Sequence, residues 1–303
     1  MKRYFYLLVA GLLLQNLSMG QTVMPLYKTV PNSKQDATYS EKAVMGKDGV
    51  TRISKVTNPT ITVFRPVKNM DQHTAVIICP GGGYEYLSFS KEGTEIAQTL
   101  IKWGITAIVL KYRLPSDAIM KDKSIGPLQD AQRAIQLIRI NAKQWNIDPS
   151  KIGIMGFSAG GSLAATASTH FDRAVIANVD NISLRPDFSV LAYPVVSMQK
   201  DITHMGSRNA LLGKNPGPAL VNDFSNELQV GAKTPPAFLV QASDDRAVSP
   251  ENSIKYYEAL LKNNVPAELH LYQNGGHGFG QKLPEDQWMN RLKSWMEHNH
   301  YLK

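Results

Sequence analysis

The sequence has one cysteine, Cys79, among 303 residues, so no disulfide can form within the chain. No spacing of cysteine and histidine resembles a zinc site, and there is no internal repeat or low-complexity tract. Basic residues outnumber acidic ones, giving a formal net charge of +8, but they are dispersed and form no block of five or six. This dispersed charge indicates a solvated surface, and we expect no nucleic-acid partner.

The sequence also lacks a long hydrophobic run, except for an apolar stretch near its start. Residues 4–14 are apolar, follow a short basic segment, and precede Ser18-Met19-Gly20, which has small residues at the −3 and −1 positions of a cleavage site. The run is short for a spanning helix. We predict a signal peptide over residues 1–20 and an exported protein, periplasmic or extracellular, with no stable membrane association after cleavage. An uncleaved N-terminal anchor is the alternative.

The rest of the chain is long enough for one large domain with a buried core. Residues 21–58 are polar and rich in turn signals, and we expect an irregular segment packed on that domain. Over residues 59–303 short apolar strands alternate with helices, which predicts the α/β class: a single, doubly wound, mostly parallel sheet with helices on both faces. The expected strands are 60–65 (an edge strand), 75–79, 105–110, 152–155, 188–193, 237–241 and 268–272, and the expected helices are 90–103 (capped by Ser90), 128–142, 161–168, 250–262 and 284–298.

A G-x-S-x-G pattern, Gly156-Phe157-Ser158-Ala159-Gly160, stands between a short buried strand and a run of small residues. A strand that turns sharply into a helix strains the serine backbone and lifts its hydroxyl above the sheet. Glycine at the flanking positions avoids clashes with neighbouring elements. We therefore predict Ser158 as a nucleophile; an ordinary strand–helix turn with an idle serine is the alternative.

A serine nucleophile needs a base and an orienting acid, which in this topology follow it as Asp or Glu and then His. His277 lies in a glycine-rich loop directly after the last expected strand, so we predict it as the base. Two adjacent carboxylates, Asp244 and Asp245, follow the strand over 237–241, and the D-x-x-V spacing favours Asp245. Its carboxylate would fix the His277 tautomer and stabilise the imidazolium. Asp244 would then be a loop or cap residue.

The tetrahedral intermediate of acyl transfer needs N–H donors. We predict them at Ala159, directly after the nucleophile, and at Gly82 and Gly83, where esterases carry an H-G-G-G motif. Pro80 replaces the histidine of that motif, and the glycine spacing does not fit a phosphate-binding loop. Tyr84 follows the glycines, and we expect its ring to wall the acyl side of the site; a packing tyrosine is the alternative. We expect no metal and no cofactor.

Five blocks in this order together resemble the exported carbohydrate (acetyl xylan-type) esterases of the α/β-hydrolase superfamily. The resemblance extends from about residue 60 to the C-terminus and implies that Ser158, Asp245 and His277 form the triad. It also implies removal of acetyl groups from plant polysaccharides, with an acylated carbohydrate as substrate and without metal or cofactor. The blocks are Cys79-Pro-Gly-Gly-Gly-Tyr84, Pro127-Leu-Gln-Asp-Ala-Gln-Arg133, Gly156-Phe-Ser-Ala-Gly-Gly161, Asp244-Asp-Arg-Ala-Val-Ser-Pro-Glu-Asn-Ser253 and Gly275-Gly-His-Gly-Phe-Gly280.

Three other functions fit parts of the sequence less well. A serine peptidase of the prolyl oligopeptidase kind shares the Asp-Asp-x-x-Val block, but residues 21–58 are too few for the propeller domain of that class. A lipase would need an amphipathic lid, and the one longer excursion, residues 198–229, is short for a lid and predicts an open site. A non-catalytic binding protein on a hydrolase scaffold is the third alternative, because fold alone does not imply activity.

Overall fold

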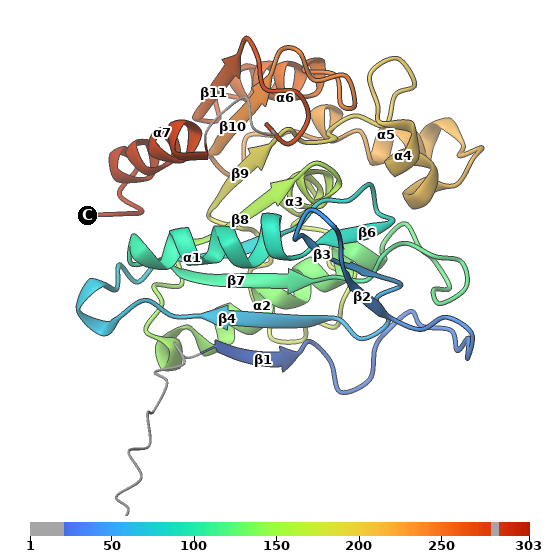
Figure 1. Cartoon of the computed structure of the whole chain (residues 1–303), viewed down its shortest axis with the longest axis horizontal. Helices are drawn as coiled ribbons and strands as arrows, with labels where there is room; N and C mark the ends of the chain where they lie inside the picture. The colour runs from blue at the N-terminus through green and yellow to red at the C-terminus, as the bar shows by residue number, and fades with distance from the viewer. Residues whose placement is uncertain (1–20, 280–284) are drawn as a thin grey trace, which may run out of the picture.

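The computed structural model describes residues 21–279 and 285–303, so the predicted signal peptide and residues 280–284 of the predicted loop and helix lie outside the described residues. An eight-stranded sheet runs through the described part in the order β1-β4-β7-β5-β8-β9-β10-β11 (Figure 1). The strands from β7 to β11 are parallel, whereas β1 and β4 run antiparallel to their neighbours. The bounds are β1 (Gln21–Pro25), β4 (Thr60–Phe64), β5 (Ala75–Cys79), β7 (Thr106–Lys111), β8 (Ile152–Phe157), β9 (Phe188–Ala192), β10 (Ala237–Ala242) and β11 (Ala267–Tyr272).

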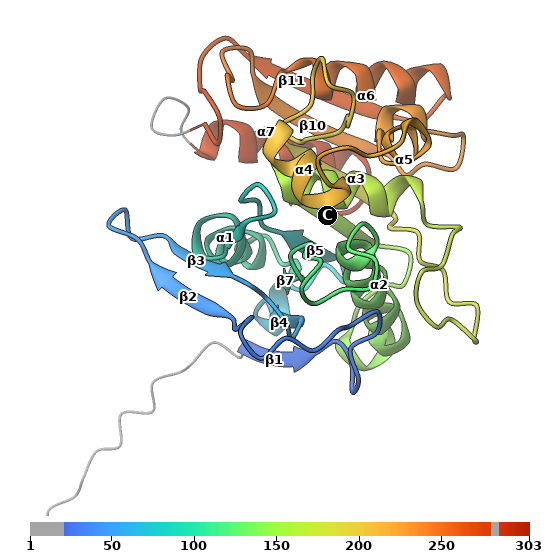
Figure 2. The same cartoon turned by 90° about the vertical axis from the view of Figure 1, so that its right-hand side faces the viewer.

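Helices cover both faces of this sheet (Figure 2). Side chains of β5 alternate between two cores, because successive residues of a strand point to opposite faces. Ile77 and Cys79 pack with α2 (Gly126–Trp145), α3 (Ala159–Thr169) and α6 (Glu251–Lys262). Val76 and Ile78 pack with α1 (Glu95–Lys102) and α7 (Glu285–His298). The predicted α/β class, with a mostly parallel sheet covered on two faces, is confirmed. Across residues 21–279 and 285–303, no helix is both long and apolar enough to cross a membrane.

The prediction of an irregular segment over residues 21–58 is wrong, because this segment contains three strands. β1 pairs with β4, so β1 rather than β4 is the edge strand of the large sheet. β2 (Lys42–Met45) and β3 (Thr51–Ser54) join β6 (Tyr86–Ser88) in a small antiparallel sheet. Most side chains of β1 and β2 are exposed, so neither strand has an apolar pattern to detect. Backbone pairing forms these strands: β1 with the distant β4, and β2 with the adjacent β3, which in turn pairs with the distant β6.

Two helices, α1 and α2, differ most from their predicted bounds. A π-helical turn over Ser90–Thr94 precedes α1, and the hydroxyl of Ser90 accepts the N–H of Thr51 at 2.8 Å instead of capping the helix. α2 is longer than expected and ends at Trp145; the next residue, Asn146, has a φ of 59°, the left-handed conformation that commonly terminates a helix. The excursion between β9 and β10 contains α4 (Met205–Leu212) and α5 (Pro218–Asp223).

The Pro127–Arg133 block stabilises the framework of the domain. The buried carboxylate of Asp130 in α2 accepts hydrogen bonds from Arg113 Nη2 at 2.8 Å and from its Nε at 3.0 Å. Arg113 Nη1 also donates to the carbonyl oxygen of Pro31 at 2.8 Å, and Arg133 Nε donates to that of Leu26 at 3.0 Å. These contacts attach the N-terminal segment to α2.

Candidate active site

Ser158 lies at the sharp turn between β8 and α3, with φ of 51° and ψ of −116°. A non-glycine residue rarely adopts this backbone conformation, which costs about 1–3 kcal/mol and marks functional turns. A Cβ on Gly156 would collide with the carbonyl oxygen of Gly160, and one on Gly160 would collide with that of Cys79 in β5. The G-x-S-x-G glycines are therefore required by the close approach of strand, turn and helix.

The structure brings the three predicted side chains into one hydrogen-bonded chain. Ser158 Oγ lies 2.9 Å from His277 Nε2, and His277 Nδ1 lies 2.8 Å from Asp245 Oδ2. Ser158 follows β8, Asp245 follows β10 and His277 follows β11, so all three stand at the carboxyl edge of the parallel strands. The order of nucleophile, base and acid is that of a serine hydrolase triad.

The environment of Asp245 keeps its carboxylate charged. Burial raises its pKa, but hydrogen bonds from His277 and from the N–H groups of Val248 and Ala247 outweigh burial and place the pKa below its usual 3.8. Both N–H groups donate to Oδ1 at 2.9 Å, whereas Oδ2 lies 2.8 Å from His277 Nδ1 and accepts the Gln241 side-chain amide at 3.4 Å. The D-x-x-V spacing thus has a physical basis, because the residue three positions on holds the carboxylate in place.

Asp244 has a different partner from its neighbour. Its Oδ1 accepts the N–H of Gly276 at 2.6 Å, one residue before the base. Asp244 therefore stabilises the loop that carries His277, in line with its predicted place as a loop residue.

The glycine loop after β5 borders Ser158, the predicted nucleophile. The N–H of Gly81 donates to Glu92 Oε2 at 2.8 Å, and the carbonyl oxygen of Gly82 accepts the N–H of Glu85 at 3.0 Å. Gly82 and Gly83 have φ of 128° and 65° and line the same pocket as Ser158. Ala159 begins α3, so its N–H has no acceptor one turn back in the helix. This arrangement suits Gly82, Gly83 and Ala159 as oxyanion donors, with Gly81 held by Glu92.

Sequence reasoning missed Glu92, which lines the pocket over Ser158, and Tyr193, which packs against the predicted base. Glu92 Oε1 accepts the hydroxyl of Tyr193 at 3.0 Å, and the Tyr193 ring meets the His277 ring edge-on with centroids 5.1 Å apart. Burial raises the pKa of Glu92, and the hydrogen bonds from Gly81 and Tyr193 only partly offset it. No motif marks Glu92, which appeared to be an ordinary residue of the helix expected over 90–103.

The expectation that Tyr84 walls the acyl side is wrong. Its side chain is 3% exposed and packs edge-on against Tyr112 in the core, with ring centroids 6.2 Å apart. Tyr84 has φ of 63°, a left-handed backbone that directs the ring away from the pocket and into the core. Burial accordingly raises the pKa of its hydroxyl. Tyr86, two residues on, lines the pocket instead.

The pocket over Ser158 has a volume of about 380 Å³ and a polar wall that includes Glu85, Tyr86 and His204. His204 was not among the predicted site residues, because the base is expected after the last strand and no motif surrounds His204. Within the described residues, no group of three or more His, Cys, Asp or Glu side chains is placed to hold a metal ion.

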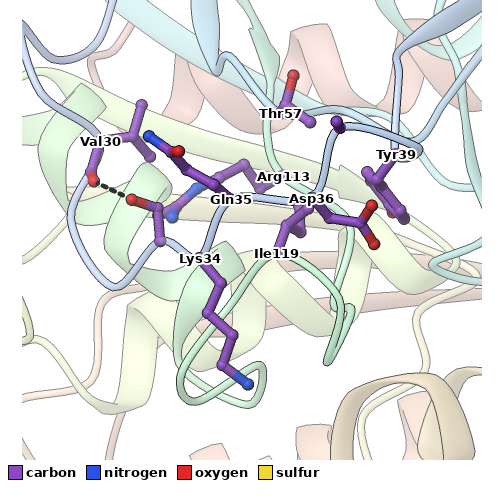
Figure 3. Close-up of a pocket in the computed structure, with 10 residues that line it drawn as sticks. Val30, Lys34, Gln35, Asp36, Tyr39, Thr57, Arg113 and Ile119 are labelled. Carbon is purple, nitrogen blue, oxygen red and sulfur yellow. Dashed lines mark hydrogen bonds between the residues drawn. The ribbon is translucent and has the colours of Figure 1, made fainter.

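A separate pocket of about 390 Å³ lies between the N-terminal segment and the loop after β7 (Figure 3). Tyr39, Gln35 and Lys34 line it, together with Arg113, whose guanidinium is engaged by Asp130 and Pro31. No triad residue lines this pocket, and its buried cation belongs to the framework.

Comparison with protein families agrees with this geometry. The family model described as BD-FAE matches residues 61–260, which is more than half of the chain. The chain belongs to the BD-FAE family. The matched segment contains Ser158, Asp245 and the glycine loop, whereas His277 follows it.

The BD-FAE chain is also similar to proteins described as carbohydrate-active enzymes. It is 37% identical over 230 residues to an acetylxylan esterase of Xylanibacter ruminicola, covering 74% of this chain and 45% of that protein. It is 38% identical over 220 residues to endo-1,4-beta-xylanase B of Butyrivibrio fibrisolvens, covering 71% of this chain and 34% of that protein. The matched part is thus less than half the length of these two relatives.

Among solved structures, an acetyl ester-xyloside bifunctional hydrolase from Caldicellulosiruptor lactoaceticus matches with a TM-score of 0.78 and 36% identity. The match covers 93% of this chain and 97% of that one. An esterase of Thermogutta terrifontis matches with a TM-score of 0.69 at 22% identity over 90% of this chain and 94% of that one, which concerns the fold alone. The predicted resemblance to acetyl xylan-type esterases is confirmed, and the similarities support the prediction of a carboxylic ester hydrolase.

Proposed function

We propose that this BD-FAE protein is a serine esterase that removes short acyl groups, foremost acetyl, from plant-type polysaccharides or oligosaccharides. The observation that carries the proposal is the unbroken hydrogen-bond chain from Ser158 through His277 to Asp245, beside a glycine loop at the mouth of a polar pocket. The similarity to an acetylxylan esterase and to an acetyl ester-xyloside hydrolase supports a carbohydrate ester as the substrate class.

In the acylation step, His277 Nε2 takes the proton of Ser158 Oγ as that oxygen attacks the ester carbonyl carbon. The carbonyl oxygen becomes an oxyanion and accepts hydrogen bonds from N–H groups of Gly82, Gly83 and Ala159. The negative charge of Asp245, 2.8 Å from Nδ1, stabilises the imidazolium that forms.

The intermediate collapses when His277 gives its proton to the alcohol oxygen, which breaks the ester bond and releases the sugar hydroxyl. The acyl group remains on Ser158 Oγ. A water molecule then loses a proton to His277 and attacks the acyl carbon, and collapse of this second intermediate releases the carboxylic acid and returns the proton to Ser158.

Export is part of the proposal and is supported by the sequence of residues 1–20. Cleavage after Gly20 would leave Gln21–Pro25 of β1, which pair with β4, in the mature chain. We propose that the mature protein acts in the periplasm or outside the cell, where it encounters acetylated polysaccharide or its fragments.

Acetate release from acetylated xylan tests the proposed function. The purified protein is incubated with acetylated xylan, with the same xylan after chemical deacetylation, and with a proline peptide substrate. We expect acetate only from the first and no peptide cleavage. If the protein hydrolyses p-nitrophenyl acetate in a parallel assay but releases no acetate from acetylated xylan, the substrate class is overturned. Faster cleavage of the peptide would favour a peptidase.

A further inference from the structure

His204 stands on the wall of the catalytic pocket without a part in the triad. It belongs to the excursion between β9 and β10, which is fixed in place because Arg208 Nε donates to the carbonyl oxygen of Met198 at 2.9 Å. Asn252 Nδ2 holds the same segment by donating to the carbonyl oxygen of Ile202 at 2.8 Å. The segment therefore presents His204 to the pocket from a defined position.

The hydrogen bonds of His204 determine its tautomer. Nδ1 accepts the backbone N–H of Ser207 at 3.2 Å, as the cap of α4, and lies 2.9 Å from the Ser207 hydroxyl. A backbone N–H can only donate, so Nδ1 carries a lone pair and the proton of the neutral ring sits on Nε2. Burial, followed by the neighbouring His277, lowers the pKa of His204, although the carboxylates of Glu85 and Asp245 act in the opposite direction. The lowered pKa favours this neutral form.

The ring of His204 borders the pocket that also holds Ser158 and His277. His204 lines the same pocket as Ser158 and His277, and its Cε1 lies 3.8 Å from the place where a Cβ on Gly83 would stand. Among the residues that the structure describes, Nε2 has no hydrogen-bond partner. Glu85 lines this pocket too, so a free donor and a carboxylate acceptor border the space over the nucleophile.

An ester of a short fatty acid presents one polar acyl atom, the carbonyl oxygen, and the oxyanion donors bind that atom. A further donor on the pocket wall therefore matches a polar atom in the alcohol part of the ester. We propose that His204 Nε2–H, with the Glu85 carboxylate, binds hydroxyl groups of the sugar that carries the acyl group. A hydroxyl both donates and accepts, so a donor and an acceptor on one wall suit a polyhydroxylated leaving group. This inference rests on the proposed function and identifies residues that select its substrate.

Two substitutions separate this contact from the cap of α4. In His204→Asn, the amide oxygen replaces Nδ1 as the cap, since asparagine is a favoured cap residue, and the pocket donor is lost. In His204→Gln, the longer amide places an N–H donor near the Nε2 position but no longer caps α4. His298→Asn, on the exposed end of α7, is the matched control.

The measurement is kcat/KM for acetylated xylobiose divided by kcat/KM for p-nitrophenyl acetate, whose leaving group has no sugar hydroxyls. We expect His204→Asn to lower this ratio about tenfold, the scale of one neutral hydrogen bond at the upper end of its range. His204→Gln should restore it to within about threefold of the parent, and His298→Asn should match the parent.

Two outcomes separate failure of this inference from failure of the proposed function. If the parent hydrolyses acetylated xylobiose and His204→Asn leaves the ratio at the parent value, the sugar contact is wrong and the esterase function stands. If the parent hydrolyses p-nitrophenyl acetate but not acetylated sugars, the proposed substrate class fails and the sugar contact with it.

Discussion

The Asp244 carboxylate accepts the backbone N–H of Gly276 at 2.6 Å, while its neighbour Asp245 binds His277 at 2.8 Å. Two adjacent carboxylates thus hold one loop at two points, and one of them contacts His277, the proposed base. This division of roles predicts different results for the same substitution at the two positions.

Asp245→Asn should lower kcat for p-nitrophenyl acetate by about 10³–10⁴-fold, because the charge that stabilises protonated His277 is lost. Asp244→Asn should lower kcat less than about threefold, since its amide oxygen still accepts the N–H of Gly276. Asp244→Ala removes that acceptor, so its kcat should lie between those of Asp244→Asn and Asp245→Asn. The reverse order for the two asparagine variants would show that the acid is assigned to the wrong residue.

Ser158→Ala should abolish acyl transfer without unfolding the protein. We expect esterase activity to fall by about 10³–10⁶-fold, the range found when a triad member is removed. The parent, but not the variant, should gain the mass of one acyl group when it is quenched during turnover and measured intact. Circular dichroism controls for folding. Activity within tenfold of the parent would exclude Ser158 as the nucleophile.

The acyl side of the site should favour short chains. The pocket over Ser158 is walled mainly by glycines and polar side chains, so it offers no long apolar channel for a fatty acid. We expect kcat/KM to fall from acetyl to butyryl to octanoyl p-nitrophenyl esters, with octanoyl nearly inert. A preference for octanoyl would contradict the short-acyl function and favour a lipase.

Tyr84→Ala separates the core role of this residue from the acyl-wall role expected from sequence. Loss of a ring packed against Tyr112 leaves a cavity, so the free energy of unfolding should drop by about 3 kcal/mol. The order of preference for the three acyl chains should stay that of the parent. Urea unfolding and ester kinetics on the same preparation distinguish the two roles, and a shift toward longer chains with unchanged stability would restore the acyl-wall role.

Glu92→Gln should raise stability increasingly as pH rises. The pKa of Glu92 is raised above its usual 4.5 by burial, with His277 and Lys91 as the charges that act against this shift. The folded state therefore favours the protonated form, and ionisation as pH rises above about 4.5 costs stability. A neutral glutamine avoids this cost, and its amide oxygen still accepts the N–H of Gly81.

The measurement is urea unfolding of Glu92→Gln and the parent between pH 4 and pH 8. The free energy of unfolding of the variant should exceed that of the parent by a larger amount at each higher pH, until Glu92 is fully ionised in the parent. Glu258→Gln, at an exposed position of α6, serves as the control for loss of a surface charge. A Glu92→Gln difference that shrinks as pH rises would show that Glu92 is stabilising as an anion.

Export predicts a defined mature N-terminus. Protein recovered from the periplasm or the medium should begin at Gln21, allowing for cyclisation of that glutamine, by intact mass or N-terminal sequencing. Recovery of a mature protein that retains residues 7–14 would contradict cleavage after Gly20 and favour an N-terminal anchor.

Much of the candidate site could be predicted from the sequence, because it depends on local chemistry. The turn at Ser158 needs glycines on both sides, the apolar runs identify buried strands, and the fixed order of strands places Asp245 and His277 at the same edge. These features depend on residues close in the chain or on a topology that repeats a simple pattern, so they could be predicted without coordinates.

The tertiary structure alone decided what depends on contacts between distant segments. The exposed strand β1 exists because its backbone pairs with β4, and the hairpin of β2 and β3 joins β6 some thirty residues further on; no apolar pattern predicts either pairing. Tyr84 sits beside the oxyanion glycines in sequence, yet its left-handed backbone directs the ring into the core. Glu92 and His204 reach the site from a helical turn and an excursion that carry no motif, because a single polar side chain acquires its role only from the groups that folding places around it.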